Sequence, residues 1–203
     1  MKNTKLRAIG LGFTSLLMLG SANAATIAQF DLGTANALGW TLITSSSLSG
    51  TNNGVTLTVA ADTGNAIDGR NRTGAVADAA GDIARDFLFN NGTISFTFTG
   101  LAASQEYEFL TYAYDANGTT GNTGSWYVGS ITSENLQHTW NTATNVSTPF
   151  TLTGTSNASG ELQIFVVAGG NNRANGFEIV QIPEPSTALL GGLGLLALLR
   201  RRR

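Results

Sequence analysis

The feature that most constrains the fold of this chain is a two-residue alternation of apolar and polar side chains in short, threonine-rich runs. It is clearest at residues 55–59 (VTLTV) and 94–99 (ISFTFT). Because successive side chains of a β-strand point to opposite faces, such runs form strands with one buried and one solvated face. Glycine, asparagine and serine cluster between the runs and favour turns. The pattern predicts an all-β protein, built as an antiparallel β-sandwich.

The predicted strands cover residues 27–32, 40–43, 55–59, 94–99, 107–114, 125–128, 150–153, 161–167 and 176–180. The best helical candidate is the stretch from Ala77 to Phe89, and Gly81 within it allows a short helical turn at most. No internal repeat or low-complexity linker divides residues 25–181, which have the length of a single domain. We therefore predict one sandwich domain over residues 25–181.

The amino-terminal segment has the layout of a secretory signal peptide. Basic residues precede an apolar run over residues 8–20, and the small residues Ala22 and Ala24 follow in an A-x-A pattern. The apolar run is too short to span a bilayer. We predict that residues 1–24 are a signal peptide and that signal peptidase cleaves after Ala24.

The carboxyl-terminal segment, residues 182–203, combines three chemically unrelated parts. They are Pro183-Glu184-Pro185, an apolar run over residues 186–199 and four arginines at residues 200–203. A 14-residue helix is roughly 21 Å long, against about 30 Å of bilayer core, so it anchors a protein poorly. The arginines resist translocation and hold their end on the cytoplasmic side. The prolines keep the preceding chain extended and open to a processing enzyme.

These three parts, in this order, resemble the PEP-CTERM sorting signal. The resemblance implies processing by an exosortase, a membrane-embedded cysteine protease or transpeptidase, after export through the inner membrane. It also implies transient association with the inner membrane through a short transmembrane helix, followed by location at the cell surface or outside the cell. The alternative interpretation of the segment is an ordinary tail anchor.

A second resemblance concerns residues 85–115 and 175–185. The first segment (RDFLFNNGTISFTFTGLAASQEYEFLTYAYD) is similar to a strand-turn-strand unit of PEP-CTERM ectodomains, and the second (NGFEIVQIPEP) to their last strand. Such ectodomains resemble galactose-binding-like jelly rolls, the architecture of many carbohydrate-binding modules. The resemblance implies a jelly-roll-like sandwich, which by itself establishes no function.

Charge and cysteine content exclude several classes of function. Residues 25–181 hold four arginines, no lysine and twelve acidic residues, a net charge of −8. A domain with this charge does not bind nucleic acid. The chain has no cysteine, which excludes disulfides and thiolate metal sites.

The residues offer little support for catalysis. His138 is the only histidine, and no G-x-S-x-G motif exposes a serine. We interpret His138, which lies close to Trp140, as a strand-edge residue. Paired carboxylates could serve a glycosidase, but most acidic residues fall in turns or at outward-facing strand positions. A polysaccharide hydrolase or lyase is therefore less favoured than a non-enzymatic protein.

One loop has the composition of a calcium site. Asp62, Asn65 and Asp68 lie in the glycine-rich stretch DTGNAIDG, and hard oxygen ligands in a flexible loop suit calcium. The same residues form a tight turn without a metal. Calcium is one interpretation and a plain turn is the other, and no further cofactor is expected.

Sugar binding needs an aromatic face beside polar groups. We predict the face at Trp126, with Trp40 and Trp140 as alternatives, and the polar groups at Asn171, Asn172 and Arg173. These three residues lie in the segment GGNNRANG, over residues 169–176, which we expect to be too polar for a core.

Taken together, these patterns predict a non-enzymatic, exosortase-processed protein of the cell surface or extracellular matrix. Its expected role is that of a carbohydrate-binding module with exopolysaccharide as the partner. The alternative is a structural matrix or biofilm protein with no defined ligand.

Overall fold

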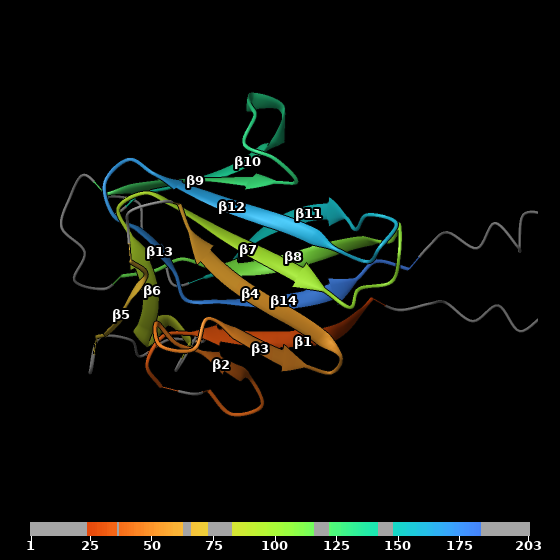
Figure 1. Cartoon of the computed structure of the whole chain (residues 1–203), viewed down its shortest axis with the longest axis horizontal. Helices are drawn as coiled ribbons and strands as arrows, with labels where there is room; N and C mark the ends of the chain where they lie inside the picture. Colours follow the sequence, from red (N-terminus) through yellow and green to blue (C-terminus); the bar gives the residue numbers. More distant parts are fainter. Residues whose placement is uncertain are drawn as a thin grey trace, which may run out of the picture.

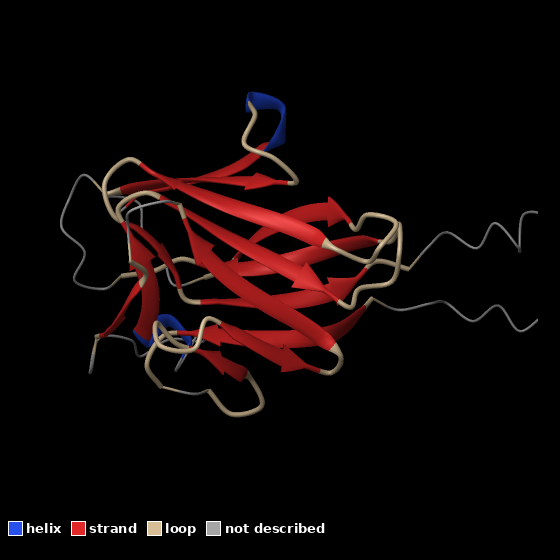
Figure 2. Cartoon of the chain, viewed as in Figure 1, coloured by secondary structure: helices blue, strands red, loops and turns tan. Residues whose placement is uncertain are grey.

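The computed structural model describes residues 24–35, 37–62, 66–72, 83–115, 122–141 and 148–183. These residues form strands and two short 3-10 turns, η1 (Ile83–Arg85) and η2 (Ser133–Asn135), as Figure 2 shows. No helix among them is long and apolar enough to cross a membrane.

The described residues form three sheets. The five-stranded sheet has the order β11 (Phe150–Thr155), β8 (Glu106–Tyr112), β14 (Gly176–Gln181), β1 (Ala25–Leu32) and β2 (Thr41–Ile43). The six-stranded sheet has the order β10 (Leu136–Asn141), β9 (Thr123–Val128), β12 (Leu162–Ala168), β7 (Thr93–Thr99), β4 (Val55–Ala61) and β3 (Ser49–Asn52). The small sheet has the order β13 (Asn172–Ala174), β6 (Asp86–Asn90) and β5 (Asp68–Asn71).

The two large sheets lie face to face, and the small sheet lies at one end of them (Figure 1). The described chain enters and leaves at the opposite end, through β1 and β14. Every strand pair is antiparallel except β1 and β2, which run parallel. The prediction of an all-β, jelly-roll-like sandwich of antiparallel sheets is confirmed, apart from this one parallel pair.

The core between the sheets is rich in aromatic rings. Phe96 and Phe98 of β7 point inward and meet Phe177 of β14, with ring centroids 4.9 and 5.3 Å apart. Phe109 of β8 packs on Phe98 at 4.9 Å. Each fully buried side chain of this size contributes about 1.5–3 kcal/mol by leaving water. This aromatic core fixes the spacing of the two sheets.

The nine predicted strands are all present, with ends that differ by at most two residues. The alternation did not identify β3, β5, β6, β10 and β13. The helical candidate ending at Phe89 is wrong over its described part, because Ile83–Arg85 form the single turn η1 and Asp86–Asn90 form β6. Four of the five β6 residues are buried, so this strand shows no alternation. The beginning of that candidate lies outside the described residues.

Candidate functional site

The predicted polar loop over residues 169–176 is largely interior. Asn172–Ala174 form β13, and Asn172, Arg173 and Asn175 expose 3% of their surface or less. Asn171 is half-buried. The expectation that this segment is too polar for the core is therefore wrong, because the polar side chains find partners inside the protein.

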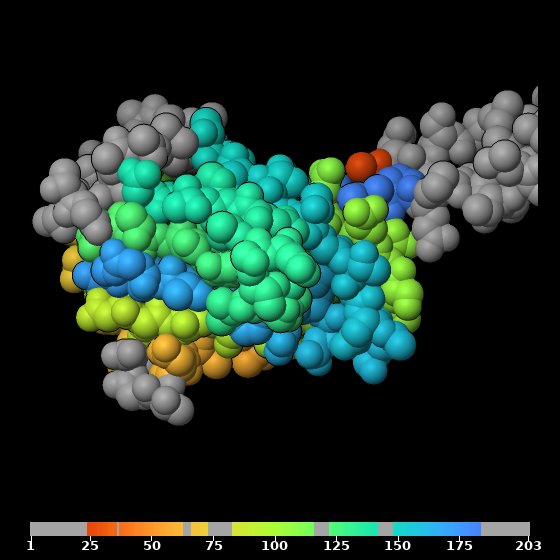
Figure 3. All heavy atoms as spheres, turned by 90° about the horizontal axis from the view of Figure 1, so that it is seen from above, coloured from red at the N-terminus to blue at the C-terminus, as the bar shows by residue number. Residues whose placement is uncertain are grey.

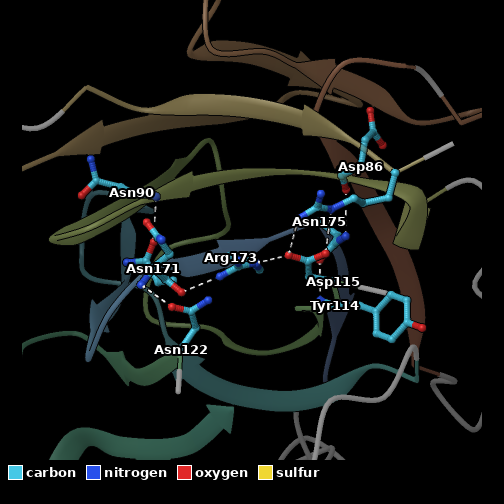
Figure 4. A network of polar contacts seen from close by, with 10 residues as sticks. Asp86, Asn90, Tyr114, Asp115, Asn122, Asn171, Arg173 and Asn175 are labelled. Atoms are coloured by element: carbon cyan, nitrogen blue, oxygen red, sulfur yellow. Dashed lines mark hydrogen bonds and ion pairs between the residues drawn. The ribbon is translucent and has the colours of Figure 1, made fainter. Parts of the chain in front are cut away.

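Arg173 is held by an ion pair with Asp115, the last described residue after β8. Its Nε lies 2.7 Å from Oδ2 of Asp115, and its Nη1 donates to the carbonyl oxygen of Asn171 at 2.7 Å (Figure 4). Arg72 donates to the same carboxylate from Nε at 2.8 Å and from Nη2 at 3.1 Å. Burial alone would raise the pKa of Asp115, but the hydrogen bonds from Arg72 and Arg173 outweigh it and lower the pKa below its usual value.

Two asparagines tie the small sheet to its neighbours. Asn175 donates from Nδ2 to the carbonyl oxygen of Asp86 at 2.8 Å and accepts from the backbone N–H of Tyr114 at 2.6 Å. Asn172 donates from Nδ2 to the carbonyl oxygen of Val166 on β12 at 3.2 Å and to that of Gly92 at 2.8 Å. Figure 4 shows Asn175 between Asp86 and Tyr114. Arg173 and Asn172 therefore hold the fold together, and the expectation that they are exposed is wrong. A ligand-binding role for them stays a prediction.

The prediction that Trp126 forms an exposed stacking face is wrong. Its side chain is fully buried, lies parallel to Phe96 at 5.9 Å and contacts Phe150 edge-on at 5.4 Å. Of the alternatives, Trp140 is also buried and lies 5.5 Å from the Arg173 guanidinium. Trp40 is half-buried. Trp126 and Trp140 are therefore part of the core.

His138 lies on β10, the edge strand of the six-stranded sheet, which confirms its interpretation as a strand-edge residue. Its ring stacks on Phe150 of β11 with centroids 3.7 Å apart. Burial lowers the pKa of His138. A neutral imidazole packed against a phenyl ring is a structural contact between two sheets.

The predicted calcium loop is described only at its two ends. Asp62 follows β4 and Asp68 begins β5, and both are exposed, while Asn65 lies outside the described residues. Asp68 accepts from the N–H of Gly69 at 2.8 Å. The described residues contain no group of three metal-ligating side chains. Calcium at this loop stays a prediction, to be tested by melting in chelator with the Asp62→Asn, Asp68→Asn double variant as control.

A groove not predicted from the sequence lies where β10 meets β11, the edge strand of the opposite sheet. We call this meeting line the seam. The Gln137 side chain bridges it, donating from Nε2 to the carbonyl oxygen of Thr153 at 2.6 Å and accepting from the Thr153 N–H at 2.7 Å. The Gln137 amide thus forms with Thr153 the two hydrogen bonds that the backbone of a neighbouring strand would form. These bonds connect the two sheets on this side of the sandwich.

The groove beside this bridge has a volume of about 360 Å³. Its lining consists of Val128, Gly129, Asn135, Gln137, Thr153, Gly154, Thr155, Asn157, Glu161, Leu162 and Gln163. Val128 and Leu162 are buried and form an apolar floor, while amides, hydroxyls and one carboxylate form the rim. Figure 3 looks down on this side, where the teal-green residues of η2 and β10 project from the surface. A second hollow of about 130 Å³, lined by His138 and Phe150 among others, continues along the seam.

Several polar groups of the groove are free to meet a ligand. The Glu161 carboxylate makes no hydrogen bond or ion pair with the described residues. Gln163 donates from Nε2 to Oγ1 of Thr97 at 3.3 Å, and its side-chain Oε1 makes no hydrogen bond with the described residues. Asn157 accepts with Oδ1 from the backbone N–H groups of Ser159 and Glu161, and its Nδ2 makes no hydrogen bond with the described residues. Together these groups present acceptors and donors above an apolar floor.

The lining of the groove does not contain the pair of acids that most glycosidases use. Among its lining residues Glu161 is the only carboxylate, and the two-carboxylate mechanism needs a partner about 5–9.5 Å away. Its chemistry suits hydrogen bonding of a polar ligand.

All four arginines of residues 25–181 lie on or beside the small sheet, away from the groove lining. Arg70 is in β5, Arg72 follows it, Arg85 ends η1 and Arg173 is in β13. The groove therefore has an acidic residue and no basic one.

Comparisons with solved structures find β-domains of low sequence identity. The CBM22-1 xylan-binding domain of Paenibacillus barcinonensis Xyn10C is 9% identical, with 78% of this chain and 96% of that chain covered and a TM-score of 0.41. The ANXUR1 extracellular domain of Arabidopsis thaliana is 12% identical, with 78% and 48% covered and a TM-score of 0.43. The K1 cleaved adhesin domain of Lys-gingipain from Porphyromonas gingivalis W83 is 12% identical, with 63% and 90% covered and a TM-score of 0.37. No curated protein matches the sequence.

The sorting segment is described only up to Pro183, which is half-buried. Ala22, Glu184, Pro185, the apolar run 186–199 and the terminal arginines lie outside the described residues. Residues 181–203 match the family described as the PEP-CTERM protein-sorting motif, which confirms the resemblance. The chain therefore carries a PEP-CTERM protein-sorting motif, which implies export and sorting to the cell surface by an exosortase.

Proposed function

We propose that this chain is a non-catalytic, exosortase-sorted protein whose groove binds a glycan of the extracellular matrix. The observation that carries the proposal is the set of uncommitted polar groups on Asn157, Glu161 and Gln163 above the floor of Val128 and Leu162. Sugars present hydroxyls around an apolar C–H face, and binding sites for them combine a few placed polar groups with apolar surface.

The charge of the groove selects the class of glycan. Glu161 is its only charged residue, and residues 25–181 carry a net charge of −8. An anionic polysaccharide, such as a uronic acid polymer, would be repelled by both. Arg173, one of the polar groups that the sequence suggested for sugar binding, is already bound by Asp115. We therefore assign a neutral or amino-sugar polysaccharide as the ligand.

Sorting places this groove where such a polymer is found. Signal peptidase releases the amino terminus and the exosortase acts on the PEP-CTERM motif, so the sandwich ends up at the cell surface or in the extracellular matrix. We propose exopolysaccharide as the polymer that it meets there.

The experiment is a binding titration of the processed protein with soluble neutral, amino-sugar and uronic acid polysaccharides. We expect saturable binding to one of the first two classes and none to the third. Glu161→Gln and Gln163→Ala should each weaken binding at least tenfold, because each removes a direct contact. The matched control is Thr58→Ala, an exposed position on β4 of the same sheet and outside the groove lining, which should change affinity less than twofold.

The second candidate function is a structural matrix protein that associates through protein contacts. Ile131 and Leu136, which flank η2, are large apolar side chains exposed by 48% and 42%. If the protein binds none of the polysaccharides yet sediments as an oligomer that Ile131→Ser disperses, the matrix role replaces glycan binding.

A further inference from the structure

The residues that border the two expected processing sites are paired with each other in the folded domain. Ala25, the first residue after the predicted signal cleavage, is paired with Gln181 across β1 and β14. Gln181 lies two residues before Pro183, the first residue of the PEP sequence. Figure 1 shows both ends of the described chain leaving the same end of the sandwich.

The chain is held in the sheet almost up to the motif. β14 pairs with β1 on one side and with β8 on the other, where Gln181 is opposite Tyr107. The next residue, Ile182, donates from its N–H to the carbonyl oxygen of Glu106 at 3.3 Å. No linker separates the last sheet bond from Pro183.

A side chain fastens this strand end. The Gln105 amide donates from Nε2 to the carbonyl oxygen of Ile182 at 2.6 Å, and also approaches that of Glu106 at 3.3 Å. Gln105 is itself buried, and its N–H donates to Oγ of Ser156 at 3.1 Å. We call this arrangement of the Gln105 side chain with the backbone of Glu106 and Ile182 the clasp.

The clasp limits what an enzyme can reach. The apolar run begins at Ser186, four residues after Ile182, so the sandwich lies within roughly 14 Å of that run along an extended chain. An enzyme that binds an extended peptide through its main chain needs free N–H and C=O groups on both sides of the site it reads. On the amino-terminal side of the motif those groups are already bonded to β8 and β1.

We propose that the clasp gates processing by the exosortase, and that Gln105 is the residue that sets the rate. The end of β14 has to leave the sheet before the motif can be taken up. Processing then follows the population of the opened strand end, as proteolysis does when opening and closing are fast. The proposal rests on exosortase sorting and is independent of glycan binding.

The first test is a pulse-chase of the full-length precursor in cells that carry the processing enzyme. Gln105→Ala removes the hydrogen bond to Ile182, so processing should become about fivefold faster, the effect of one typical hydrogen bond on a local equilibrium. The matched control is Gln137→Ala, which removes a similar amide-to-backbone bridge at the seam. It should leave the processing rate unchanged.

The second test inserts ten glycine and serine residues between Ile182 and Pro183. The enzyme then finds free backbone on both sides of the motif, so processing should be fast and Gln105→Ala should have no further effect. The proposal is overturned if Gln105→Ala leaves the rate of the native-length precursor unchanged, or if Gln137→Ala accelerates it equally. If every precursor keeps its full length, including the one with the insertion, exosortase sorting itself is wrong.

Discussion

Arg173 and Asp115 form a buried ion pair, 2.7 Å from Nε to Oδ2, at the junction of β13 with the end of β8. Arg72, which follows β5, binds the same carboxylate, so one aspartate joins three segments that are distant in sequence. The domain has only four arginines, and two of them are used on this one carboxylate. This is the arrangement that attaches the small sheet to the sandwich.

The first prediction concerns the loss of this pair. Arg173→Ala should lower the free energy of unfolding by about 3–5 kcal/mol, because it leaves the Asp115 carboxylate buried with an incomplete set of partners. Arg70→Ala is the matched control. Arg70 is exposed and lies 4.6 Å above the ring of Phe89, a contact with a contribution of about 0.5–1 kcal/mol. Urea unfolding of both variants measures the difference, and equal losses would contradict a structural role for Arg173.

The second prediction is a pH dependence with a defined sign. The arginines hold the pKa of Asp115 below its usual value, which is about 3.9 in an unfolded chain. The carboxylate therefore stabilises the fold fully above about pH 4, and this contribution is lost as the pH falls through the lower, folded pKa. Urea unfolding between pH 6 and pH 3 measures it.

The pKa of Asp86 is shifted in the opposite direction to that of Asp115. Its contribution to the pH dependence of stability therefore has to be separated from that of Asp115. Burial raises the pKa of Asp86 in spite of the hydrogen bonds from the Thr34 and Ala35 N–H groups, so its ionised form is unfavourable in the folded state. That penalty disappears as the pH falls through its folded pKa. Asp115→Asn keeps the Asp86 contribution and should remove the acid-induced loss. An unchanged acid profile in Asp115→Asn would show that another carboxylate is responsible.

The sandwich could be predicted from the sequence because many of its strands have one solvent-facing and one buried face, which produces an alternation of polar and apolar residues. That condition fails in the small sheet, where β13 is buried throughout and β6 nearly so. Its polar residues look like a surface loop until Asp115, 58 positions before Arg173, is placed beside them. Long-range pairing of this kind leaves no local pattern.

The groove was missed for a related reason. It depends on the approach of β10 to β11 from opposite sheets, and on the two hydrogen bonds between the Gln137 side chain and the backbone of Thr153. Trp126 is a different case, since it and its neighbour Tyr127 lie in one strand and therefore point to opposite faces. Trp126 shares its face with Gly124 and Val128, both buried, and this parity was the available indication that the tryptophan points inward.

The third prediction concerns that ring. Trp126→Ala should lower the free energy of unfolding by about 3–5 kcal/mol, because it empties a fully buried site between Phe96 and Phe150. Trp40→Ala, at a half-buried ring, should have a clearly smaller effect. Thermal and urea unfolding decide the matter. A loss below about 1 kcal/mol for Trp126→Ala would mean that the ring is not part of the core.

The fourth prediction uses two glycines of the groove that differ in their surroundings. A Cβ on Gly154 would lie 2.5 Å from Cγ1 of Val128 and 2.7 Å from Cδ1 of Leu162, so Gly154→Ala pushes against the groove floor. We expect a destabilisation of about 1–3 kcal/mol by overpacking and at least tenfold weaker glycan binding. Gly129 has a φ of +85° and nothing within 4 Å of its Cβ position, so Gly129→Ala strains the backbone, by about 1–2 kcal/mol, without displacing a neighbour. Binding measured on both variants, at a temperature where both are folded, should therefore fall only for Gly154→Ala. A parallel fall in both would mean that stability, and not the shape of the groove floor, controls binding.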